Sequence, residues 1–141
     1  FFTGKLIDRF GVINIMLAGI LLMLAYLALA FSGVTWGVFT GALILMGIGW
    51  NFLYVGGTSL LATTYTTEEK GVAQATNDMS VFIFSLICSL GAGPLLNAYG
   101  WKTMHLLLVP WVLFLMVPLL WLAVRKKRQD NAENEVTLPL Q

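Results

Sequence analysis

The sequence contains little charge for its length. Lys, Arg, Asp and Glu make up 11% of the 141 residues, whereas a soluble domain carries roughly 25%. Most of the charges lie in three clusters, at residues 5–9, 68–70 and 125–135. Between the clusters run apolar stretches of ~20 residues, the length that crosses a bilayer as a helix. With 58% hydrophobic residues and a mean hydropathy of +0.82, the composition excludes a soluble domain and predicts an all-α integral membrane protein.

The sequence also lacks the groupings that catalytic and metal sites require. No cluster of His, Cys, Asp and Glu has metal-ligand spacing, no nucleophile–base pair stands out, and no glycine-rich loop precedes a Lys-Ser/Thr pair. We therefore expect no enzyme activity, no metal, no cofactor and no nucleotide-driven motor. The one cysteine, Cys88, is interpreted as a packing residue and His105 as an interface residue. The net charge of +1 gives no sign of a nucleic-acid partner.

Four apolar segments are predicted to span the membrane. Tight turns containing Gly33 and Gly100 join the first segment to the second and the third to the fourth. The polar residues 129–141 are predicted to form a disordered tail, so that residues 1–128 hold the transmembrane part. The four spans cover about residues 12–31, 36–62, 79–96 and 104–124.

A polar loop, residues 63–75, joins the second span to the third. Thr66 or Thr67 can cap the helix that follows, because a side-chain oxygen at that position accepts a free backbone N–H. Glu68 and Glu69 then lie at the end of the helix where negative charge is favourable.

Basic residues indicate the orientation of the spans. Lys102 lies at one end of them, and all other basic residues lie at the opposite end. Since basic loops stay in the cytoplasm, residues 1–11, residues 63–75 and the tail are predicted to be cytoplasmic, in a multi-pass protein of the cell's inner membrane. Trp36 and Trp101 then lie at the outer boundary, where interfacial tryptophans are common.

The first eleven residues contain a charged segment between two glycines, Gly4 and Gly11. The glycines permit a sharp reversal between two helix ends. Asp8 can lie against a helix N-terminus, and Arg9 can reach a carboxylate or a helix C-terminus. The simpler interpretation is a solvated turn between two helices.

The pattern Gly4-x-x-x-Asp8-Arg9-x-Gly11 resembles the cytoplasmic loop signature of the major facilitator superfamily. In that family the signature lies between helices two and three and again between helices eight and nine. Val12 and Ile13 stand where the usual form has basic residues, which is more similar to the second copy. The resemblance implies an alternating-access carrier, with Asp8 and Arg9 in a cytoplasmic gate contact.

By this resemblance the chain is the C-terminal piece of a longer protein. It corresponds to helices nine to twelve, which make up most of the second six-helix half of the carrier. An alternative placement is helices three to six. Helix five of some exchangers in the family ends Gly-Pro, two residues, then Gly-Gly, and this chain has Gly93-Pro94 without the second glycine pair. The implied partners are a small-molecule substrate, the lipid bilayer and the missing N-terminal half.

The second span carries a polar stripe. At 100° per residue, Asn51, Tyr54 and Thr58 lie within about one-third of the helix circumference. Asn51 lies near the middle of the span, where an amide needs a partner or water. We predict Asn51 and Tyr54 as substrate contacts and Trp50 and Thr58 as secondary ones. The alternative is that Asn51 bonds a neighbouring helix and the aromatic residues pack.

Asp78 is the one carboxylate close to a span, at the cytoplasmic end of the third. It can join a gate contact, bind a proton or favour the helix start. The leading hypothesis for the chain is part of a secondary-active carrier that moves a small solute. The alternative is a small self-associating four-span assembly or scaffold protein without transport.

Overall fold

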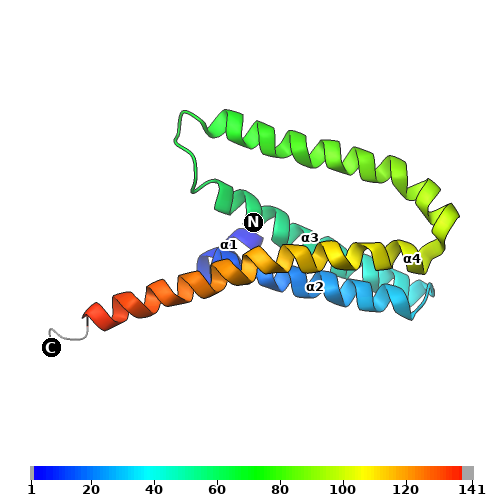
Figure 1. Cartoon of the computed structure of the whole chain (residues 1–141), viewed down its shortest axis with the longest axis horizontal. Helices are drawn as coiled ribbons and strands as arrows, with labels where there is room; N and C mark the ends of the chain where they lie inside the picture. The colour runs from blue at the N-terminus through cyan, green and yellow to red at the C-terminus, as the bar shows by residue number, and fades with distance from the viewer. Residues whose placement is uncertain (1, 138–141) are drawn as a thin grey trace.

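The computed structural model describes the backbone of residues 2–137 and the side chains of residues 3–128 and 131. The described residues form helices and no strand, which confirms the predicted all-α fold (Figure 1). Three of the helices are long and apolar enough to cross a membrane. In chain order the helices are α1 (Phe2–Phe10), α2 (Val12–Ser32), α3 (Trp36–Leu61) and α4 (Lys70–Thr137).

Helix α4 is bent sharply at Gly100. This glycine has φ 75° and ψ 172°, a conformation in which a residue with a Cβ is strained. The bend divides α4 into a first arm, residues 70–99, and a second arm, residues 101–137, which run in opposite directions (Figure 1). The sequence predicts a turn over residues 97–102, whereas the structure keeps the helix on both sides and reverses the chain at one residue.

The arms of α4 extend beyond the predicted spans. The first arm begins at Lys70 rather than at residue 79, and the second continues to Thr137. Residues 129–137, predicted as disordered tail, are therefore helical in the structure, and residues 138–141 lie outside the described part. Gln129, Ala132, Glu133 and Glu135 are residue types with good helix propensity.

The segment before Gly11 is a helix, not the glycine-bracketed turn that we expected. Gly4 lies inside α1, and the chain reverses at Gly11 alone, where φ is 84°. The helix is amphipathic: Thr3 is buried and Leu6 is half-buried, whereas Gly4, Lys5 and Asp8 are exposed. The spacing of its apolar residues at three and four positions carries this signal, which the charges and glycines obscured.

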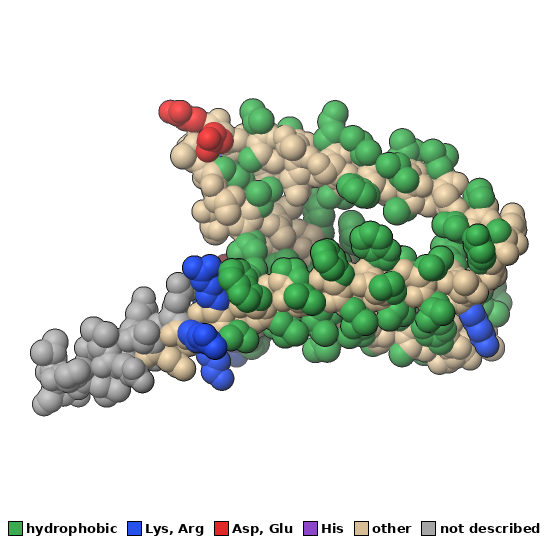
Figure 2. Space-filling model, viewed as in Figure 1, with side chains coloured by type: hydrophobic (Ala, Val, Ile, Leu, Met, Phe, Trp, Pro, Cys, Tyr) green, Lys and Arg blue, Asp and Glu red, His purple; other side chains and the backbone are tan. Residues whose placement is uncertain are grey.

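The helix ends alternate between the two ends of the molecule. The α2–α3 connection and the bend of α4 lie at one end, and Gly11 and the α3–α4 loop lie at the other (Figure 1). Figure 2 shows hydrophobic side chains along the helices and charged side chains gathered at the two ends. This distribution is the one that an apolar slab with polar boundaries selects.

Helices α2 and α3 approach each other most closely at two glycines. A Cβ on Gly19 would lie 3.0 Å from the backbone oxygen of Gly49, and a Cβ on Gly49 would lie 3.0 Å from that of Gly19. Small residues at a crossing point let two membrane helices pack backbone to backbone. Next to the crossing, Ile20 is 1% exposed and is the most deeply buried large side chain of the described residues.

A buried histidine joins the second arm to α2. The His105 side chain is 3% exposed, with Nδ1 2.8 Å from the Trp101 carbonyl oxygen and Nε2 2.9 Å from the Tyr26 hydroxyl. Since a carbonyl oxygen can only accept, Nδ1 carries the proton and Nε2 accepts from Tyr26. The indole Nε1–H of Trp101 donates to the Ala30 carbonyl oxygen at 3.1 Å. His105 is thus a packed structural residue instead of the interface residue that we expected.

Glu69 accepts two hydrogen bonds from Thr66 in the loop before α4. The backbone N–H and the hydroxyl of Thr66 both donate to Glu69 Oε2, each at 3.1 Å. These hydrogen bonds, the backbone one first, lower the pKa of the Glu69 carboxyl from its ordinary value of 4.5. The predicted cap, in which a threonine side-chain oxygen accepts a backbone N–H, is not the one observed among the described residues: the Thr66 hydroxyl donates to Glu69, and the Glu69 carboxylate supplies one half of a capping box.

We expect the Glu69 carboxylate to titrate below pH 4.5 in the folded protein and to return toward 4.5 in Thr66→Val, which lacks the hydroxyl donor. A depressed folded-state pKa means that the cap stabilises the loop above pH 4.5. That stabilisation is lost as the pH falls through the folded-state value. NMR of the 13C-labelled side-chain carboxyl measures the midpoint. A midpoint at or above 4.5 in the wild type would contradict the cap.

Candidate functional site

Three cavities open between the helices, and the Trp50 side chain lines all of them. Their volumes are about 300, 370 and 430 Å³. We call them the inner, central and lateral cavities. The inner cavity lies between α2, α3 and the second arm, the central cavity touches both arms, and the lateral cavity lies against the first arm. Figure 2 shows the molecule hollowed between the first arm and the remaining helices.

Trp50 and Tyr54 form a flat aromatic pair on α3. One helical turn separates them, so both project from the same face. Their ring centroids lie 6.3 Å apart with an interplanar angle of 15°, which is a stacked arrangement. The Trp50 side chain is 55% exposed and that of Tyr54 is 38% exposed. Because stacked rings of this kind keep a free face, the pair can accept a third ring against it.

The hydroxyl of Tyr54 connects α3 to the first arm. It donates to Asp78 Oδ1 at 2.9 Å, and Asn77 Nδ2 lies 3.3 Å from the same oxygen. A hydrogen bond to a carboxylate is stronger than one between neutral groups. Most side chains of the first arm beyond Val81 are exposed, so this contact helps to restrain where the arm lies relative to α3.

Of the predicted substrate contacts, Trp50, Tyr54 and Thr58 lie together at the central cavity, whereas the Asn51 side chain faces α1. The first three line the central cavity. The Thr58 hydroxyl donates within its own helix, to the carbonyl oxygens of Tyr54 and Val55, both at 3.0 Å. Asn51 Oδ1 accepts from the hydroxyl of Thr3 in α1, and Asn51 lines none of the three cavities. The amide therefore has a partner in a neighbouring helix.

The residues of the loop motif lie around the end of α1, away from these cavities. Asp8 and Arg9 are exposed, and among the described side chains neither takes part in an ion pair. The Arg9 guanidinium lies 5.4 Å from the centre of the Phe10 ring, a cation–π distance. The structure thus leaves the gate contact that the resemblance implies for Asp8 and Arg9 as a prediction.

Sequence reasoning missed the face of the first arm that lines the cavities. Asn77 lines both the central and the lateral cavity and lies beside Trp50 there. The signal was present as a stripe at helical spacing, at which every member falls on one side of the helix. The residues of the first arm that line the lateral cavity are Asn77, Ser80, Val81, Phe84, Ser85 and Cys88.

The chemistry of the cavities is suited to binding. Their walls are mostly apolar, with an amide, hydroxyls and one hydrogen-bonded carboxylate at the edge. Within the described residues, no three side chains of His, Cys, Asp and Glu are grouped to hold a metal ion. Apolar walls with few convergent polar groups are typical of small-molecule sites.

Apolar spanning helices around cavities of solute size are the architecture of a membrane carrier. The sequence profile of the Major Facilitator Superfamily matches residues 1–141, and the chain belongs to this family of transporters. The resemblance drawn from the loop motif is thereby confirmed, and the chain is part of an integral multi-pass membrane protein.

Two relatives show what the chain is similar to. The riboflavin transporter RfnT of Brucella anthropi is 42% identical over 120 residues, which cover 85% of this chain and 30% of that protein. The uncharacterized MFS-type transporter YdeG of Bacillus subtilis is 35% identical over 81 residues, which cover 56% of this chain and 19% of that protein. The chain thus spans less than a third of the length of these relatives. No solved structure matches it significantly.

Proposed function

We propose that this chain forms part of a secondary-active carrier that moves a small, flat, heteroaromatic solute across the membrane, with riboflavin as the first candidate. Membership of the family supports transport by alternating access. The candidate solute rests on RfnT, whose matched 120 residues necessarily include residues 22–120 of this chain. The aromatic pair, the Tyr54–Asp78 contact and Asn77 all fall within that stretch.

The observation that carries the proposal is the stacked pair Trp50–Tyr54 at the point where the three cavities meet. A planar ring system gains from a planar partner, because offset stacking adds to the burial of apolar area. The polar edge made by Asn77 and the Tyr54 hydroxyl supplies hydrogen-bonding groups for ring heteroatoms or a polar substituent. Trp50 thus becomes the primary contact, and Asn51 becomes a structural support for α3.

The rest of the site is expected from an N-terminal half, with this chain as helices nine to twelve. The first arm exposes a row of large apolar side chains, which supports cover by lipid or by further protein. Substrate sites of such carriers lie between two halves near the bilayer midplane. The exposed large side chains of the first arm are Val72, Met79, Phe82, Ile83, Phe84, Leu86, Ile87, Leu90, Leu95, Leu96 and Tyr99.

The proposed orientation puts Gly11, the α3–α4 loop and the end of the second arm in the cytoplasm, in the inner membrane of a cell. The basic side chains at that end support it. Asp78 contacts Tyr54 in the C-terminal half of α3, toward the α3–α4 loop. This contact can form and break when the arms move. We propose that Asp78 and Tyr54 together hold one state of the carrier.

Uptake of labelled riboflavin by cells that express the full-length protein tests the proposed function. We expect saturable transport above the empty-vector level. A trimethyl isoalloxazine without the sugar-alcohol chain should compete, whereas ribitol should not, because the aromatic pair binds the ring. If ribitol competes and the isoalloxazine does not, the aromatic pair is not the recognition element. If no flavin is transported in either direction, riboflavin is not the solute.

A further inference from the structure

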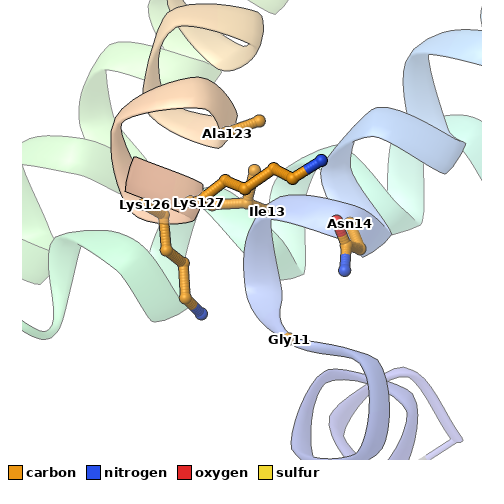
Figure 3. Close-up of a pocket in the computed structure, with 6 residues that line it drawn as sticks. All are labelled: Gly11, Ile13, Asn14, Ala123, Lys126 and Lys127. Carbon is orange, nitrogen blue, oxygen red and sulfur yellow. The ribbon is translucent and has the colours of Figure 1, made fainter. Parts of the chain in front are cut away.

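A fourth cavity, separate from the three described above, lies at the end of the molecule where α2 begins. Its volume is about 360 Å³, and we call it the basic cavity. Figure 3 shows its walls: the turn at Gly11 and the first turn of α2 on one side, and the second arm on the other. The lining residues are Gly11, Ile13, Asn14, Ala123, Lys126 and Lys127.

The charge of the basic cavity is positive. Lys126 and Lys127 extend from the same helix end in different directions, Lys127 toward the side of Asn14 (Figure 3). Lys126 approaches the turn so closely that a Cβ on Gly11 would lie 3.8 Å from its Nζ. No carboxylate is among the lining residues, and no described side chain forms an ion pair with either lysine.

Backbone geometry adds to this charge. Gly11 is the residue before α2 and has no side chain with which to cap the helix; its carbonyl oxygen accepts from the Ile15 N–H at 3.3 Å. The first N–H groups of a helix have no partner within it and carry partial positive charge. The side-chain amide nitrogen of Asn14 donates to the Phe10 carbonyl oxygen at 2.8 Å, which fixes the turn beside the cavity.

The four consecutive basic residues 125–128 of the second arm have different surroundings. The Arg125 guanidinium lies over the Trp121 ring, 5.2 Å from its centre. Neither Arg125 nor Arg128 lines the basic cavity. The sequence alone treats the run 125–128 as one patch, whereas the structure directs two adjacent lysines of that run into a cavity.

The position of the basic cavity along the membrane normal indicates which part of the bilayer it faces. The apolar run of α2 begins at Val12, and that of the second arm ends at Val124, directly before the basic residues. The cavity therefore lies at the boundary between hydrocarbon and water, at the level of the lipid headgroups. The proposed orientation, on which this step rests, puts this end on the cytoplasmic side, where anionic phospholipids are the abundant source of phosphate.

We propose that the basic cavity binds the phosphate of an anionic phospholipid headgroup, held between the turn at Gly11 and the side chains of Lys126 and Lys127. The bound lipid bridges the start of α2 and the basic stretch 125–128 of the second arm. Free phosphate shares the same chemistry, but the position at headgroup depth commits the site to a lipid.

Native mass spectrometry of the purified full-length protein, titrated with phosphatidylglycerol and separately with phosphatidylcholine, tests this proposal. We expect the double variant K126Q/K127Q to lose affinity for phosphatidylglycerol by about tenfold or more, because each basic group near the surface contributes to lipid attraction. The control R125Q/R128Q removes the same charge from the same stretch of helix, and because neither arginine lines the basic cavity it should cost clearly less affinity than K126Q/K127Q does. K126R/K127R should retain binding.

Equal losses in the two glutamine double variants would overturn the site, since the basic run would then act as an unstructured patch. Equal binding of phosphatidylcholine and phosphatidylglycerol by the wild type would also overturn it. Millimolar inorganic phosphate is the third arm: displacement of the lipid by phosphate would show that the cavity takes the free anion. Helical circular dichroism and a single elution peak establish that each variant is folded.

Discussion

Trp50→Ala is expected to lower riboflavin transport by about tenfold or more at an unchanged amount of protein in the membrane. The indole lines all three cavities and stacks on Tyr54, so its removal takes away the flat face and joins the cavities into one. A solute bound against this face loses both buried apolar area and ring stacking. The measurement is the initial rate of uptake over a range of riboflavin concentrations, normalised to surface expression.

Two further variants separate stacking from a general loss of bulk. Trp50→Phe keeps a smaller ring and should retain most of the transport. Trp36→Ala makes the same chemical change on the same helix, but Trp36 is 88% exposed at the start of α3 and lines none of the three cavities. It should transport within about twofold of the wild type. Equal defects in Trp36→Ala and Trp50→Ala would remove the special role of Trp50.

Gly49→Ala is expected to destabilise the protein by about 1–3 kcal/mol, because overpacking a close contact forces the surroundings to move. The new Cβ would lie 3.0 Å from the backbone oxygen of Gly19 and 3.3 Å from side-chain atoms of Leu22 and Met23. The side chains can adjust, but the backbone oxygen can move only if α2 and α3 separate. Thermal unfolding of the purified full-length protein, followed by circular dichroism, measures the loss.

Gly47→Ala provides the matched control on the same helix. Gly47 is exposed, and a Cβ there meets nothing within 4 Å. Alanine also has a better helix propensity than glycine by about 1 kcal/mol, so this variant should be unchanged or slightly more stable. If both variants lower the melting temperature equally, the effect comes from glycine itself and not from the crossing of α2 and α3.

The sequence predicts α2 and α3 well because the length of an apolar run alone decides where each of these helices lies. The apolar run that forms α2 and the run that forms α3 have the length of a bilayer crossing, and the observed bounds differ from the predicted ones by one residue at the C-terminal end. For residues 129–137 the backbone is helical, although the polarity of the segment predicts disorder, because helix propensity is a separate property from polarity. Helix α1 was missed because its glycines and charges suggested a turn and concealed the amphipathic spacing.

The candidate site was only partly predictable for a different reason. Helical periodicity places Trp50, Tyr54 and Asn51 near one another, but it does not say which neighbouring helix each one meets. The structure turns the Asn51 amide to Thr3 and the Tyr54 hydroxyl to Asp78. Such pairings join residues 48 and 24 positions apart, and they depend on how the helices pack.

The most direct test of the account is the binding of riboflavin to the purified full-length protein, followed by flavin fluorescence. Stacking on an indole quenches the flavin, so the account predicts saturable quenching in the wild type. Trp50→Ala should lose most of this quenching, whereas Trp36→Ala should retain it. Absence of saturable quenching in the wild type, or equal quenching by Trp50→Ala, would contradict the claim that the aromatic pair of α3 binds a flat solute.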